Sequence, residues 1–186
     1  MKKIWKSLLI VQTCLMYISL TFFLGTLFII NLTDNEDITN TLLTLGLIIG
    51  IIALLIGGLN FVFSIINIFK GGTSPINTTI VIKMVLIPWY LGNFFVWFLL
   101  VGAFSNPFLF IGIPLIICIG VFITYMYMIF ISAPNISYVF SLIKNKEIHT
   151  NKLLIVSLVF HFIFCLDVIG SFMLKKALKD ALIENQ

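Results

Sequence analysis

The chain has 186 residues, of which 61% are apolar and 10% are charged, and its mean hydropathy is +1.19. Soluble domains carry about 25% charged residues, so this composition excludes a soluble globular enzyme and indicates an integral membrane protein. The 11 basic residues, all lysines, outnumber the 7 acidic ones. These lysines lie mostly beside apolar segments, where lysine anchors helices at lipid headgroups, so we expect the lipid bilayer as partner and no nucleic acid.

Apolar segments dominate the chain, and the gaps between them hold most of the charge. The segments cover about residues 7–32, 42–69, 80–104, 108–133 and 153–174. Each supplies the roughly 20 apolar residues that a helix needs to cross a hydrocarbon core of about 30 Å. The sequence therefore predicts one all-α domain over residues 1–186, a polytopic membrane helix bundle of about five transmembrane helices.

Lysines near the segment ends predict the orientation, because cytoplasmic loops carry an excess of positive residues. If the segments alternate, seven lysines share one side: Lys2, Lys3, Lys6, Lys70, Lys144, Lys146 and Lys152. This places the N-terminus in the cytoplasm and the C-terminus outside, although three further lysines lie near the C-terminus. Residues 175–186 are expected to form a short amphipathic tail on the membrane, and Lys83 is expected to snorkel to the inner headgroups. The use of lysine alone, with abundant Ile, Asn and Phe, favours a bacterial cytoplasmic membrane.

The second segment carries small and polar residues on one helical face, at alternating steps of four and three. They are Gly46, Gly50, Ala53 and Gly57, which form a helix-packing seam, followed by Asn60, Ser64 and Asn67. Small residues let a neighbouring backbone approach closely, and the polar ones donate hydrogen bonds across the contact. Two interpretations remain open, namely packing within the chain, or a polar cavity or partner helix. In the first segment, the row Thr13, Tyr17, Thr21 and Gly25, with Gln12 nearby, is expected to face this seam.

Polar groups inside the later segments are candidates for a ligand site. Asn93 lies between Trp89 and Trp97 in the third segment, and the fifth segment contains His161 and Asp167. A charged carboxylate within a membrane costs about 3 kcal/mol on insertion scales, so Asp167 must be paired, protonated or hydrated. On one continuous helix the six-residue spacing turns His161 about 120° away from Asp167, so no direct pair is expected.

Chemical motifs are missing from the sequence. Cys14, Cys118 and Cys165 show no metal-ligand or disulfide spacing, and no catalytic triad, phosphate loop or zinc-protease motif occurs. We therefore expect no metal, no cofactor and no enzymatic activity. The sequence favours a non-catalytic binding, partner or accessory membrane subunit, with another membrane protein or a second copy as partner. The alternative is a component of a small-solute or proton-coupled transporter, with a polar cavity around Asp167, His161, Asn60 and Asn93.

Four stretches carry a resemblance to a known family: Lys2 to Lys6, Asn106 to Phe110, Asn135 to Ser137, and His161 to Gly170. Over nearly the full chain they look like signature stretches of a small polytopic membrane-protein family of Gram-positive bacteria, a domain of unknown function. The resemblance implies a bacterial plasma membrane and several helices. It brings no activity and no site residue.

Overall fold

The computed structural model describes residues 2–30, 32, 36–70, 76–103, 112–148, 150–163 and 166–183. Helices make up the regular structure of these ranges: α1 (Lys2–Ile30), α2 (Glu36–Lys70), α3 (Ile76–Ala103), α4 (Gly112–Lys144), α5 (Lys152–Phe160) and α6 (Leu166–Ile183). This confirms the predicted all-α class for the described part of the chain. In the same ranges, α1 to α4 are long and apolar enough to cross a membrane.

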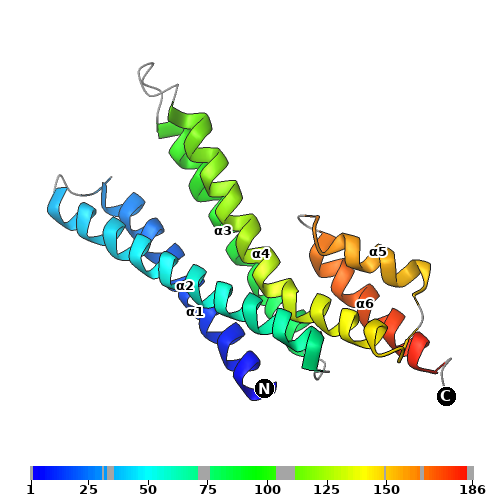
Figure 1. Ribbon diagram of the computed structural model, residues 1–186. Coiled ribbons are helices and arrows are strands. Elements are labelled where there is room, and N and C mark those ends of the chain that lie inside the picture. Colours follow the sequence, from blue (N-terminus) through cyan, green and yellow to red (C-terminus); the bar gives the residue numbers. More distant parts are fainter. Residues whose placement is uncertain are drawn as a thin grey trace.

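The four long helices form two antiparallel hairpins arranged as a V (Figure 1). One hairpin consists of α1 and α2 and the other of α3 and α4. They contact each other toward the ends at Lys70 and Lys144 and diverge toward the ends at Glu36 and Ala103. The short helices α5 and α6 lie beside the second hairpin, and α1 begins and α6 ends toward the lower side of the view. The V therefore has a closed end and an open end.

The pairing of α1 with α2 depends on small residues of α2. A Cβ atom at Gly46 would lie 3.2 Å from Cβ of Phe22, and one at Gly50 would lie 3.1 Å from Oγ of Ser19, both in α1. Ser19 Oγ also donates a hydrogen bond to the carbonyl oxygen of Gly46 at 2.9 Å. Contacts of this kind stabilise helix pairs in lipid, where burial from water provides no driving force between helices.

The fourth helix is longer than the segment predicted at 108–133. It continues through Pro134 to Lys144, so residues 134–144, predicted as part of a gap, are helical. Proline removes one backbone hydrogen bond, but membrane helices tolerate it where neighbouring groups satisfy the freed carbonyls. Beyond Pro134 the helix buries Val139 and Leu142, which explains why it does not end there.

The prediction of one continuous helix over 153–174 is wrong, because this segment is divided between α5 and α6. Asn151 begins α5 as its N-cap, and its side chain accepts a hydrogen bond from the Leu154 amide at 2.8 Å. The nine residues of α5 reach only about 14 Å, less than a hydrocarbon core. A Cβ at Gly170 of α6 would lie 2.8 Å from Cβ of Phe160 and 3.0 Å from the Ser157 carbonyl oxygen, so this glycine permits the close approach of α5.

The C-terminal residues also differ from the surface tail predicted at 175–186. Residues 175–183 continue α6 and are amphipathic, as predicted, but their apolar side is covered by protein. Leu174, Ala177, Leu178 and Ala181 pack with Ile76 and Ile80 of α3 and Val139 of α4. The apolar side of this helix is therefore unavailable to lipid.

Candidate functional site

An ion pair joins α3 to α6 inside the protein. Lys83 and Asp167 are in contact, with Lys83 0% and Asp167 4% exposed. Ser132 Oγ of α4 donates to Asp167 Oδ1 at 2.9 Å, and Lys83 Nζ donates to Ser171 Oγ at 2.9 Å. The expectation that Lys83 snorkels to the headgroups is therefore wrong, because a buried carboxylate holds its ammonium group instead.

His161 extends this group of polar side chains toward α5. Its Nδ1 lies 2.7 Å from the carbonyl oxygen of Ser157, so Nδ1 carries the proton, since a carbonyl only accepts. Its Nε2 lies 3.3 Å from Ser171 Oγ, and that hydroxyl also lies 3.0 Å from the backbone carbonyl oxygen of Asp167. His161 and Asp167 thus meet through Ser171. We call Lys83, Ser132, His161, Asp167 and Ser171 the Lys83 cluster.

The arrangement of the Lys83 cluster differs from that of a hydrolytic triad. In a triad the carboxylate accepts the Nδ1 proton of the histidine, which holds the imidazole ready to take the serine proton. Here Nδ1 bonds to Ser157, and the Asp167 carboxylate bonds to Lys83 and Ser132. The members come from α3, α4, α6 and the turn after α5, and each is nearly or fully buried. The geometry is that of a polar bridge between helices.

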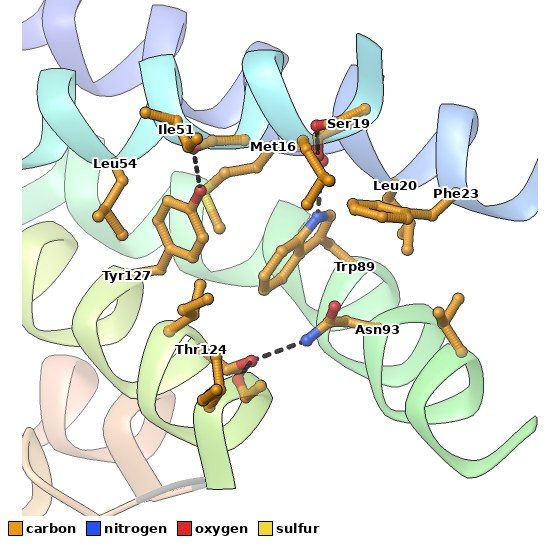
Figure 2. A pocket seen from close by; sticks show the side chains of 17 residues that line it. Met16, Ser19, Leu20, Phe23, Ile51, Leu54, Trp89, Asn93, Thr124 and Tyr127 are labelled. Carbon is orange, nitrogen blue, oxygen red and sulfur yellow. Dashed lines mark hydrogen bonds between the residues drawn. The ribbon is translucent and has the colours of Figure 1, made fainter. Parts of the chain in front are cut away.

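A second feature is an apolar cavity of about 260 Å³ between the two hairpins (Figure 2). Its lining comes from α1, α2, α3 and α4, and Met16, Trp89 and Tyr127 form its buried floor. The rings of Trp89 and Tyr127 pack edge to face, with centroids 5.6 Å apart. The cavity therefore takes its wall from both hairpins and its floor from buried side chains.

Polar groups in the cavity wall bond to the protein itself. Trp89 Nε1 donates to the Met16 carbonyl oxygen at 2.8 Å, and the Tyr127 hydroxyl donates to the Gly50 carbonyl oxygen at 2.6 Å. Asn93 Nδ2 donates to Thr124 Oγ1 at 2.8 Å (Figure 2). Because these donors are engaged within the wall, the surface that faces the cavity is mainly hydrocarbon.

The four polar residues of the predicted transporter cavity do not converge. Asp167 and His161 belong to the Lys83 cluster, while Asn93 lines the apolar cavity. Asn60 is fully buried on α2, and neither its own amide nor that of Asn67 has a hydrogen-bond partner among the described residues. Ser64 bonds back to the Asn60 carbonyl oxygen at 2.7 Å. The candidate residues thus lie in three different environments.

The seam on α2 packs within the chain. A Cβ at Gly57 would lie 2.5 Å from Cδ2 of Phe130 in α4 and 2.6 Å from Nε2 of Gln12 in α1. Ala53 is fully buried beside these contacts. Of the two open interpretations, the structure shows intramolecular packing for Gly46, Gly50 and Gly57.

The expected partner row of the first segment is not the one that meets this seam. The Tyr17 hydroxyl donates to the Val85 carbonyl oxygen of α3, and a Cβ at Gly25 would meet nothing within 4 Å. Gln12, which was predicted beside the row, does meet the seam, and so does Ser19, which was not predicted. The row follows a strict four-residue step, so its positions drift around a helix of 3.6 residues per turn.

The sequence interpretation missed the roles of Lys83, Ser132 and Ser171. One signal was present, since Lys83 is a cation within an apolar stretch and Asp167 is the corresponding anion, and such groups in lipid pair with one another. The serines carried no comparable signal. No group of three or more metal-binding side chains occurs in the described ranges. Cys165 and the Asn106-Pro107 turn lie outside those ranges.

Comparison with known proteins places the chain in a family without providing an activity. No curated protein and no solved structure matches it. A family model described as "Family of unknown function (DUF6652)" matches residues 4–180, a stretch that contains α2 to α5, most of α1 and α6, and both sites above. The chain therefore belongs to this family, whose function is unknown.

Proposed function

We propose that this chain is a non-catalytic, multi-pass membrane protein that acts by binding another membrane component in the cavity between its two hairpins. The observation that carries the proposal is the apolar cavity of about 260 Å³, whose floor is buried and whose polar wall groups are already bonded. Sites that bind apolar ligands combine a concave, mostly hydrophobic wall with few polar groups. We place this accessory role in a bacterial cytoplasmic membrane.

The test is to identify what copurifies with the protein in mild detergent. Ile123 of α4 lines the cavity and is 37% exposed, so Ile123→Trp narrows the cavity from its edge. Its neighbour Phe122 is exposed and does not line the cavity, so Phe122→Trp is the matched control. We expect mass spectrometry to find a lipid or protein that is depleted at least fivefold by Ile123→Trp alone. Equal recovery from both variants would refute the proposal.

We also propose that four helices cross the membrane and that both termini lie in the cytoplasm. The reversal between α5 and α6 supports this topology, because it returns the chain to the end of the molecule that carries the N-terminus (Figure 1). Lys175, Lys176 and Lys179 then join the lysines of the cytoplasmic side, which removes the exception to the positive-inside rule that five crossings left. The proposal replaces the external C-terminus expected from the sequence.

Reporter fusions test the topology. Green fluorescent protein attached after Gln186 should fluoresce, and alkaline phosphatase at the same position should be inactive, since each reporter works on one side of the membrane. Phosphatase inserted after Leu32, an exposed residue beyond α1, is the control and should be active. Active phosphatase at the C-terminus would instead support five crossings.

A transporter role is less well supported. It would need polar side chains that converge on a common path, whereas Asp167, Asn93 and Asn60 lie in separate environments. The Lys83 cluster is also closed on itself, because its charges bond to one another.

A further inference from the structure

The volume of the cavity limits the class of ligand that fits it. The ligand class inferred from it rests on the proposed function, in which the cavity binds another membrane component. An apolar cavity of about 150 Å³ already accepts benzene, and sites for whole drug-sized molecules start near 300 Å³. A helix with its side chains is about 10–12 Å across. A volume of about 260 Å³ therefore suits part of a flexible chain and is too small for a transmembrane helix.

The cavity is open toward the side. Among its lining residues, Ile51 of α2 is 57% exposed and Ile119 of α4 is 49% exposed, whereas Met16 on the floor is 1% exposed. Ile51 belongs to α2 and Ile119 to α4, two helices that diverge toward the open end of the V (Figure 1). In a bilayer, an opening between two apolar helices gives access to lipid hydrocarbon chains.

The wall chemistry selects among molecules that carry such chains. None of the described lining residues is charged, so the cavity suits a hydrocarbon chain whose charged group stays outside it. A phospholipid keeps its charged headgroup at the membrane surface and needs to insert only its chain. We propose that the cavity binds one acyl chain of a phospholipid, which enters sideways between α2 and α4.

Photolabelling of the full chain in phospholipid nanodiscs tests this site. The probe is a phosphatidylcholine with a diazirine in the middle of one acyl chain, and the crosslinked residues are mapped by mass spectrometry. We expect labels on cavity-lining residues of both α2 and α4, such as Leu54 and Thr124. Labels restricted to exposed residues outside the cavity would overturn the proposal.

Ile51→Trp should block the opening and reduce the Thr124 label at least fivefold. Leu55 lies one turn further along α2, is exposed and does not line the cavity, so Leu55→Trp should leave this label unchanged. Equal labelling of both variants would contradict the proposal. Ile123→Trp, from the opposite wall, repeats the test if Ile51→Trp fails to fold.

Two further results separate the possible ligands. A diazirine fatty acid should label the cavity residues more weakly than the phospholipid probe does, and stronger labelling by the fatty acid would refute the choice of a phospholipid. Loss of a copurifying protein in Ile123→Trp, without phospholipid labelling of the wild-type cavity, would overturn this inference while leaving the proposed binding function intact.

Discussion

The Lys83 cluster and the apolar cavity show two different uses of polar side chains inside one membrane protein. In the cluster, charged groups from distant helices bond to one another, and Lys83 and Asp167 are almost completely removed from the surroundings. In the cavity wall, Trp89 and Tyr127 donate hydrogen bonds to backbone carbonyl oxygens of other helices, and their rings line the cavity. The first arrangement joins helices, and the second forms a surface on which another molecule can bind.

The energetics of buried charge explain why the cluster has to be complete. The attraction within a buried ion pair offsets the free-energy cost of desolvation only when both partners are present and their remaining hydrogen bonds are satisfied. Ser132 and Ser171 supply those bonds to Asp167 and Lys83. The cluster therefore attaches α6 to α3 and α4, and it should respond more strongly to single substitutions than the cavity wall does.

Loss of one charge from the Lys83 cluster should have the largest effect. Lys83→Ala or Asp167→Ala leaves the opposite charge buried without a partner, so each should reduce the free energy of unfolding by about 3–5 kcal/mol. The double variant Lys83→Met/Asp167→Leu removes both charges and should lie closer to the wild type than either single variant. Unfolding in detergent with increasing dodecyl sulfate measures these differences.

Lys176→Ala, an exposed lysine on α6, is the control and should change the free energy of unfolding little. Single variants of Lys83 and Asp167 that behave like this control would show that the ion pair does not hold α6 in place.

A second substitution tests the packing that closes the V. A methyl group at Gly57 would overlap Phe130 and Gln12, so Gly57→Ala should destabilise the protein by about 1–3 kcal/mol. The adjacent Gly58 has nothing within 4 Å of an added Cβ, so Gly58→Ala should be neutral or stabilising by up to about 1 kcal/mol. Thermal unfolding of both variants in the same detergent gives the comparison. A neutral or stabilising Gly57→Ala would mean that α2 does not meet α1 and α4 closely at this seam.

The smallest effect is expected in the cavity wall. Tyr127→Phe removes the hydrogen bond to the Gly50 carbonyl oxygen and should cost about 0.5–1.5 kcal/mol of unfolding free energy. Tyr125→Phe loses a longer, exposed bond of 3.2 Å and should cost less. A Tyr127→Phe effect as large as that of Asp167→Ala would remove the distinction between the two regions.

Much of the secondary structure follows from the sequence, because length and hydropathy are properties of a local segment. The helical state of the segments at 7–32, 42–69 and 80–104 agrees with α1, α2 and α3. The small residues of α2 also indicated a close contact, but their pattern does not name the helix that makes it. Whether α1 and α4 meet Gly57 depends on how the hairpins cross.

The sequence alone determined that the chain is mostly apolar, that it forms helices, and that Asp167 must be paired, protonated or hydrated within them. Only the tertiary structure decided that 153–174 reverses into α5 and α6, that the end of α6 packs on protein, and that Lys83 meets Asp167. The physical reason is distance along the chain, since these two residues are 84 positions apart. Local periodicity and hydropathy report the preference of a segment, whereas an ion pair between two helices arises only when the whole bundle brings both side chains to one place.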